Sequence, residues 1–227
     1  MSSPNARGRK SPRLPRKRPG PAGGKRDRNR RETVQTLHDA ALRLFLAGGI
    51  EGVTIDEIVA AAGIAKGSFY RSAADKADLV SQIMTPVGDE VIAALDRCEQ
   101  GLRVARADTL AGIYVQLASD LSVVVARQAR LVLLYLQEAR SPASPARRSI
   151  HAIAEQLTTR AVALTQTARA HGLIRDVDPE VSALTVLGAI DTILFEHLRQ
   201  RRLPASRGAS VINELVTIVL RGILARP

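Results

Sequence analysis

The segment VTIDEIVAAAG, residues 53–63, limits the possible folds of this chain more than any other stretch, because it contains both a helix start and a helix stop. Thr54 and Glu57 have the spacing of a capping box, in which each side chain binds the backbone N–H of the other residue. Gly63 follows the last apolar position and is suited to the left-handed conformation that ends many helices. The segment therefore predicts a short helix that is followed by a tight turn.

Helical patterns lie on both sides of this short helix. Apolar residues recur at three- and four-residue spacing from Arg31 until Gly48-Gly49, and a further short helix is predicted from Ala65 to about Ser72. Three helices of this length joined by a glycine turn are typical of a helix-turn-helix with a leading support helix.

The last helix of this motif holds Phe69 and Tyr70, two of only six aromatic residues in the chain. If Phe69 points inward, a rotation of 100° per residue places Gly67 and Arg71 on the outward face, with Ser68 and Tyr70 on the flanks. A helix with such a face suits the major groove of DNA, with flanking groups on phosphates. The alternative is that Tyr70 packs against the next helix and that the segment is only a helical corner.

The net charge of +11 lies entirely at the N-terminus. The first 31 residues hold 12 of the 33 Lys and Arg residues but only one acidic residue, Asp27, so the remaining chain is neutral. Residues 1–30 are rich in Pro, Gly and Ser and predict a disordered basic arm. Such an arm either contacts nucleic acid, for example in a narrow minor groove, or is a solvated tail.

The segment TIDEIVAAAGIAKGSFYRSAADKADLV, residues 54–80, resembles the DNA-binding segment of the tetracycline-repressor (TetR) family of transcriptional regulators. The resemblance covers about residues 31–83 and implies a DNA-binding domain at 31–84, with contacts to phosphate from Thr54, Tyr70 and Lys76. The residues that it implies at the DNA are Thr54, Ala65, Lys66, Gly67, Ser68, Tyr70, Arg71, Ser72 and Lys76. The family usually has His or Tyr and then Phe where this chain has Ser72 and Ala73, so an aromatic core residue is missing here.

Residues 85–227 are helical in pattern and form the predicted ligand-binding and dimerisation domain. Pro86 is expected to kink or interrupt the helix that starts at Asp75. Gly172 is expected to end one helix, and Asp178-Pro179 to start another. The predicted helices lie at roughly 87–105, 108–126, 128–139, 146–171, 179–202 and 209–225.

The last two predicted helices are the most apolar and belong either to the core of one protomer or to a dimer interface. The family resemblance implies a four-helix dimer interface, and a two-fold dimer would match a palindromic operator. The predicted interface residues are Val181, Leu184, Leu187, Gly188, Asp191, Ile212, Leu215, Val216 and Val219.

The middle helices either fill a core or surround an apolar cavity with a few polar groups, which is the usual form of a small-molecule site. The resemblance implies a pocket for an inducer in this region, and a lipophilic inducer is expected. The predicted lining residues are Tyr114, Leu117, Leu121, Leu134, Tyr135, Glu138, Ile153 and Leu157.

Little in the sequence indicates catalysis or a cofactor. The four histidines are isolated, no CxxC or nucleotide-binding glycine motif is present, and Cys98 reads as a small packing residue. No secretory signal and no apolar run long enough to cross a membrane is seen, so a cytoplasmic protein without enzyme activity, cofactor or metal is expected.

The sequence thus predicts an all-α, dimeric, ligand-responsive transcriptional regulator, and specifically a repressor that a small molecule releases from its operator. Two alternatives stay open. One is an architectural nucleic-acid-binding protein that is held by its basic arm. The other is a helical interaction module that does not bind DNA.

Overall fold

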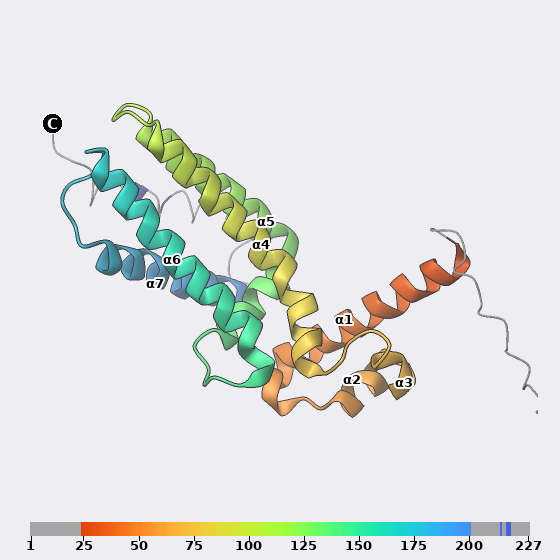
Figure 1. Cartoon of the computed structure of the whole chain (residues 1–227). Helices are drawn as coiled ribbons and strands as arrows, with labels where there is room; N and C mark the ends of the chain where they lie inside the picture. The colour runs from red at the N-terminus through yellow and green to blue at the C-terminus, as the bar shows by residue number, and fades with distance from the viewer. Residues whose placement is uncertain (1–23, 201–213, 215–216, 219–227) are drawn as a thin grey trace, which may run out of the picture.

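The computed structural model describes residues 24–200, 214, 217 and 218, and these residues contain helices and no strand, as the all-α prediction requires. The elements in chain order are α1 (Lys25–Gly52), α2 (Ile55–Ala62), α3 (Lys66–Phe69), α4 (Lys76–Arg103), α5 (Leu110–Glu138), the 3-10 helix η1 (Pro145–Arg147), α6 (Arg148–Ala170) and α7 (Pro179–Gln200). Figure 1 shows α1, α2, α3 and the start of α4 at one end of the molecule, and α4 to α7 packed lengthwise as its body.

The first helix is longer than the sequence predicts. It begins at Lys25, so residues 25–30 are helical and the predicted disordered arm of 1–30 extends six residues too far. The reason is local: after Gly24 the sequence contains good helix formers, and Asp27 in the first turn interacts favourably with the helix dipole. The rest of the predicted arm lies outside the described residues. The predicted break at Gly48-Gly49 is confirmed, because Gly49 has a positive φ of 72° inside the assigned helix.

Pro86 was expected to kink or interrupt the fourth helix, and the structure excludes the interruption. α4 continues from Lys76 to Arg103 with Pro86 in its interior. Proline in a helix interior costs about 3 kcal/mol. Burial of Met84 and Val87 on both sides of the proline holds the chain in the helical path and offsets this cost. The predicted domain boundary at 84/85 therefore falls inside one continuous helix.

The hydrophobic core also crosses that boundary. One cluster of buried side chains contains Phe45, Ile58 and Phe69 from the N-terminal end together with Leu134 and Ile153 from the body. A second cluster lies further along α4, α5 and α6 and contains Cys98, which confirms the role of this residue in packing. The two predicted domains thus share one helix and one core cluster.

Several local predictions for the body are confirmed. α5 contains one non-helical residue, Gln128, where two separate helices were predicted to meet. Gly172 follows α6 with a φ of 63°, and the carboxylate of Asp178 accepts a hydrogen bond of 2.8 Å from the N–H of Val181 at the start of α7. In the predicted final helix at 209–225, Glu214, Thr217 and Ile218 are helical and the other residues lie outside the described part.

The helix α7 is unusually apolar. By length and composition Pro179–Arg199 could cross a membrane, which differs from the expectation that no segment is long and apolar enough. In the structure α7 packs on α5 and α6 with one face, while Val181 and Leu184 are exposed on the other. An apolar surface of this kind suits a contact with another helical surface.

Candidate functional site

The helix-turn-helix is held by the capping box that the sequence predicts. The hydroxyl of Thr54 accepts from the N–H of Glu57 at 3.2 Å, and the Glu57 carboxylate accepts from the N–H of Thr54 at 2.8 Å. These hydrogen bonds hold the pKa of Glu57 below its ordinary value. Gly63 ends α2 with a φ of 65° and donates to the carbonyl of Ala60. The turn before α3 is thus fixed by backbone and side-chain bonds together.

The orientation predicted for Phe69 and Tyr70 is confirmed. Phe69 is fully buried, whereas Tyr70 is 53% exposed and stands nearly perpendicular to it, with ring centroids 5.2 Å apart. The guanidinium of Arg71 donates to the hydroxyl of Ser68 at 2.6 Å on the exposed surface. A Cβ added at Gly67 would meet only the end of the Arg71 side chain, so this face of α3 is open to another surface.

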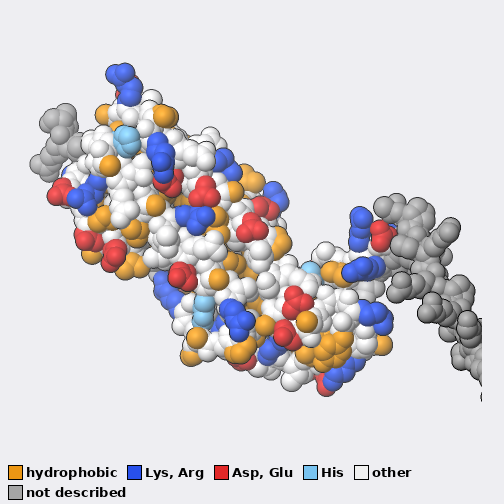
Figure 2. All heavy atoms as spheres, in the orientation of Figure 1, with side chains coloured by type: hydrophobic (Ala, Val, Ile, Leu, Met, Phe, Trp, Pro, Cys, Tyr) orange, Lys and Arg blue, Asp and Glu red, His pale blue; other side chains and the backbone are white. Residues whose placement is uncertain are grey.

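The Lys and Arg side chains near α3 differ in whether they are already paired with an acidic side chain. Figure 2 shows Lys and Arg side chains, with acidic ones among them, on the surface of the end that holds α1, α2 and α3. The ammonium of Lys66 lies 2.6 Å from the carboxylate of Asp56, and both side chains are exposed, so this ion pair is weak and can be exchanged for a phosphate contact. Ala65 and Ser72 lie at the two ends of the same segment, where Ser72 donates to the carbonyl of Ser68.

Lys76 lies at the start of α4, where the family resemblance implies a phosphate contact, and here its side chain is bonded within the chain. Its ammonium donates to the backbone carbonyls of Ile50 at 2.8 Å and Val53 at 3.1 Å, and its side chain is only 21% exposed. The reason is that the last carbonyls of α1 lack helical partners, and the ammonium satisfies them. The hydroxyl and N–H of Thr54 are likewise both used by Glu57. In this structure the donors of both side chains are engaged within the chain, and their phosphate contacts stay predictions.

Glu138 lies in a buried ion pair and not in the wall of the cavity. It was predicted to line the pocket, but its buried carboxylate accepts from the N–H of Ile50 at 3.0 Å and from the guanidinium of Arg147 at 2.5 Å. Arg147 is also nearly buried and lies 3.8 Å from Glu51. Glu138 thus ties the end of α5 to α1 and η1, at the junction of the helix-turn-helix with the body (Figure 1).

A second connection at this junction involves a histidine. Nε2 of His38 in α1 lies 3.4 Å from the amide oxygen of Gln82 in α4. The amide nitrogen of Gln82 donates to the carbonyl of Ser72 at 3.0 Å and to the Asp78 carboxylate at 3.2 Å, so the amide oxygen is left to accept from His38. This chain of bonds runs from α1 through α4 to the residues that follow α3.

The His38 site predicts how stability depends on pH. Burial lowers the pKa of His38 below 6.5, against a smaller opposing effect of Gln82. The unfolded chain therefore binds this proton more readily, so stability from the neutral imidazole is complete above about pH 6.5 and declines as the pH falls below it. The free energy of unfolding in urea is measured at pH 7.5 and at pH 5.5 for the wild type and for His38→Gln, which keeps a donor for Gln82. The difference between the two pH values should be smaller for the variant than for the wild type. An equal difference in both proteins would contradict this assignment.

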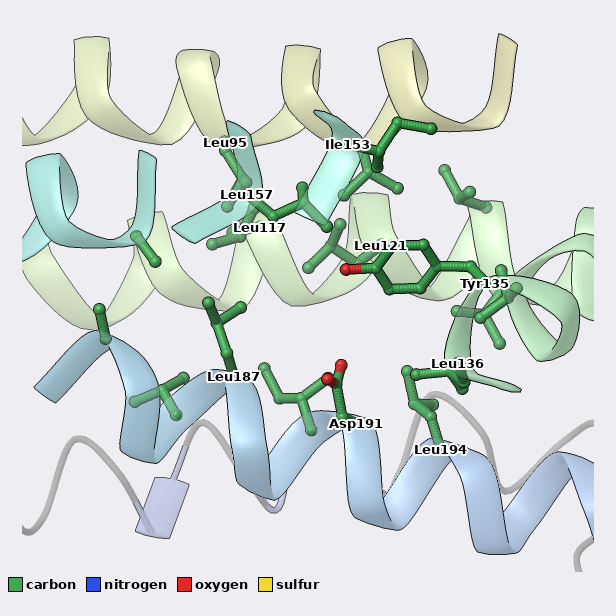
Figure 3. Close-up of a pocket in the computed structure, with 18 of the residues that line it drawn as sticks. Leu95, Leu117, Leu121, Tyr135, Leu136, Ile153, Leu157, Leu187, Asp191 and Leu194 are labelled. Atoms are coloured by element: carbon green, nitrogen blue, oxygen red, sulfur yellow. The ribbon is translucent and has the colours of Figure 1, made fainter. Parts of the chain in front are cut away.

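The body encloses an apolar cavity of about 220 Å³ between α4, α5, α6 and α7 (Figure 3). Its walls include Tyr114, Leu117, Leu121, Tyr135, Ile153 and Leu157, all of which were predicted to line a pocket. Leu134 and Glu138 do not line it. Leu134 is fully buried in the core cluster that is shared with the helix-turn-helix, and Glu138 belongs to the ion pair described above. Both lie on faces of α5 that do not meet the cavity. The prediction included them because helical spacing alone does not show which face of a helix points inward.

The helix α7 closes one side of the cavity. Leu187 and Asp191, predicted at a dimer interface, line the cavity, whereas Val181 and Leu184 are exposed. Gly188 has nothing within 4 Å of an added Cβ. The interface positions Ile212, Leu215, Val216 and Val219 lie outside the described residues.

The polar groups of the cavity are few. Burial raises the pKa of the Tyr135 hydroxyl to about 12, with a smaller contribution from Asp191, and burial also raises the pKa of Tyr114. Both phenols are therefore neutral at physiological pH. Burial likewise raises the pKa of the Cys98 thiol to about 12, so this thiol is not activated. Among the described residues, no three His, Cys, Asp or Glu side chains gather as a metal site would require.

Comparison with known proteins agrees with this geometry. The family model described as "Bacterial regulatory proteins, tetR family" matches residues 37–83. The chain is 44% identical over 52 residues to the HTH-type transcriptional regulator AcrR of Shigella flexneri, a match that covers 23% of this chain and 24% of that protein. The similarity in sequence thus spans about a quarter of that relative's length.

Solved structures extend the similarity in fold to most of the chain. The TetR family regulator PfmR of Thermus thermophilus has a TM-score of 0.62 at 20% identity, covering 91% of this chain and all of its own. FadR of Bacillus subtilis in complex with stearoyl-CoA has a TM-score of 0.62 at 17% identity, covering 83% of this chain and 98% of its own. The SmeT–triclosan complex (SmeT is a repressor from Stenotrophomonas maltophilia) has a TM-score of 0.62 at 18% identity, covering 86% and 92%.

The capped helix-turn-helix, the family match over the same residues and the all-helical body agree: residues 37–83 match the TetR family of bacterial regulatory proteins, and the chain as a whole has the fold of solved TetR-family regulators.

Proposed function

We propose that this protein is a dimeric transcriptional repressor in the cytoplasm, which binds a palindromic operator and is released from it by a small lipophilic molecule. The observation that carries the proposal is the geometry of α3. Its buried Phe69 anchors the helix while Tyr70 and Arg71 face outward beside Gly67. The family match over residues 37–83 supports DNA as the partner of this face.

The proposed contacts to DNA follow from the groups that are free on this face. Arg71, held by Ser68, is the candidate for a base contact, and Tyr70 presents its hydroxyl to a phosphate. Lys66 is available once it leaves Asp56. Gly67 and Ala65 lack large side chains, so they allow a close approach, and Ser72 lies at the end of the segment.

Substitution of Arg71 tests this orientation. Arg71→Ala should weaken binding to the preferred duplex by roughly 1–3 kcal/mol and relax preference at one base position in each half-site. The side chain is exposed, and among the described residues it is bonded to Ser68 alone, so the change should leave the fold intact. Binding is measured by fluorescence anisotropy on the preferred duplex and on single-base variants of it. Unchanged affinity and preference would show that Arg71 does not read bases.

The dimer is proposed from the exposed face of α7. Val181 and Leu184 are more than half exposed although they are apolar. The second copy of this chain is the proposed occupant, because a two-fold pair places two recognition helices for a palindromic site. The described part of α7 supplies one helix of each protomer to this contact.

The cavity is the proposed site of the inducer. Its wall is almost entirely apolar with a few polar groups, as is usual for small-molecule sites, and its volume is about 220 Å³. The fold neighbours FadR and SmeT were solved with stearoyl-CoA and triclosan, respectively, and this supports a lipophilic ligand. A ligand that prefers a conformation with misplaced recognition helices would shift the population away from DNA, and by linkage DNA would weaken ligand binding equally.

The first test is selection of duplexes from a random pool by the purified full-length protein at near-physiological salt. Enrichment of a two-fold palindrome is expected for the proposed repressor. Enrichment of A·T-rich sequence alone would favour an architectural protein held by its basic arm. No enrichment would favour the helical interaction module.

A further inference from the structure

Asp191 is the one acidic side chain that lines the described cavity. The other lining groups are apolar side chains, glycine, two tyrosines, Thr165 and Ser182. In Figure 3 the Asp191 carboxylate points from α7 into the space between Leu187 and Leu194, on the side that faces Tyr135. A carboxylate in such a wall is unusual, because an ionised group is poorly solvated among apolar side chains.

The carboxylate is only partly neutralised by its partner. Burial raises the pKa of Asp191, while the Arg140 guanidinium, 3.2 Å from Oδ2, opposes this rise. Arg140 is 68% exposed and lies with Asp191 at a polar depression on the outer side of α5 and α7. An ion pair with so exposed an arginine is screened by water and weak. Among the described residues, no donor is bonded to Oδ1 of Asp191.

The arrangement has the properties of a site for a positive charge. A cation inside the cavity would gain the attraction of a carboxylate in surroundings of low polarity, where charge interactions are stronger than in water. The ring of Tyr135 lies on the same side, and an aromatic face also attracts a cation. An anionic ligand would meet repulsion from Asp191 and no cation among the described lining residues.

We infer that the cavity selects lipophilic cations, amines or quaternary ammonium ions with an apolar body, and that Asp191 is their counter-ion. The inference rests on the proposed function in one respect, since it takes this cavity as the inducer site. It adds the charge class of the ligand and the residue that determines it.

A series of ligands with one tail and three head groups tests the inference. Decyltrimethylammonium, decanol and decanoate are titrated into the full-length protein by calorimetry, the two ions below their micelle concentrations and decanol below its solubility limit. The ammonium compound should bind at least about tenfold more tightly than decanol, and decanoate should bind most weakly. Asp191→Asn should remove this preference while binding of decanol is kept or improved.

The matched control is Glu196→Gln. Glu196 lies five residues beyond Asp191 at the polar depression and is not among the residues that line the cavity, so the change removes the same charge from the same helix. This variant should keep the preference for the ammonium compound. Equal binding of the three compounds, or loss of the preference in both variants, would overturn the inference.

Release of the selected duplex separates this inference from the proposed function. If decanol binds and releases DNA as well as the ammonium compound does, the charge selection is wrong and the ligand-responsive repressor stands. If none of the three compounds binds, both the charge selection and the inducer site fail.

Discussion

Replacement of Glu138 by alanine is expected to lower the free energy of unfolding by about 3–5 kcal/mol. The change leaves the nearly buried guanidinium of Arg147 without its closest carboxylate, and it leaves the N–H of Ile50 without an acceptor. Both losses occur where water does not readily replace the missing bonds. Urea unfolding followed by circular dichroism measures the effect.

A double-mutant cycle separates the ion pair from simple loss of packing. Arg147→Met should also destabilise the protein strongly, because it leaves the carboxylate of Glu138 buried without its cation. The combined variant Glu138→Leu with Arg147→Met should recover much of the stability, since it leaves no unpaired buried charge. Additive losses in the double variant would show that the two side chains are not coupled.

The same junction gives a functional readout. If Glu138 transmits the state of the cavity to α1, the combined variant should bind the preferred duplex but lose much of its release by ligand. Unchanged release in a folded double variant would place the coupling elsewhere.

Replacement of Phe69 by alanine is the second change with a large expected effect, a loss of about 3–5 kcal/mol. Phe69 is fully buried and belongs to the core cluster that includes residues of α1, α2 and the body. Ala73, also buried, cannot fill the space, because it lacks the aromatic ring usual for the family at this position. The loss is measured by urea unfolding, and DNA affinity should fall with it.

The neighbouring aromatic provides the control. Tyr70→Phe should leave the unfolding free energy within about 0.5 kcal/mol of the wild type, since the ring is exposed and only its hydroxyl is removed. It should weaken binding to all duplexes alike, as expected for a phosphate contact. A large loss of stability in this variant, or an effect confined to one sequence, would contradict the roles given to the pair.

The features that sequence reasoning predicts well are those that neighbouring residues determine. The capping box of Thr54 and Glu57 and the end of α2 at Gly63 depend on hydrogen bonds between residues at most a few positions apart. The inward direction of Phe69 follows from helical rotation once the core side of α3 is chosen.

The features that sequence reasoning misses depend on partners far away in the chain. Lys76 caps carbonyls that lie more than twenty residues upstream, and Glu138 binds Ile50 across 88 residues. A pattern over a few neighbouring residues does not show which distant residues will be bonded to them. Pro86 shows the same limit, because only tertiary packing explains why the helix continues through it.

The face of α7 was ambiguous for a different reason. This helix is apolar nearly all around, so periodicity does not say which side meets the cavity and which meets another surface. The structure assigns Leu187 and Asp191 to the cavity and leaves Val181 and Leu184 exposed.

The unbroken path of α4 through Pro86 has a mechanical consequence. The helix has 28 residues, which makes it about 42 Å long. Gly88 and Leu95 of this helix line the cavity. The first turn of the helix comes shortly after α3 in the chain. If a helix of this length tilts by about 5° about one end, its other end is displaced by about 3.7 Å. That is about one base-pair step along DNA, so in the proposed dimer a small change in the cavity would be enough to put the two recognition helices out of phase with a palindrome.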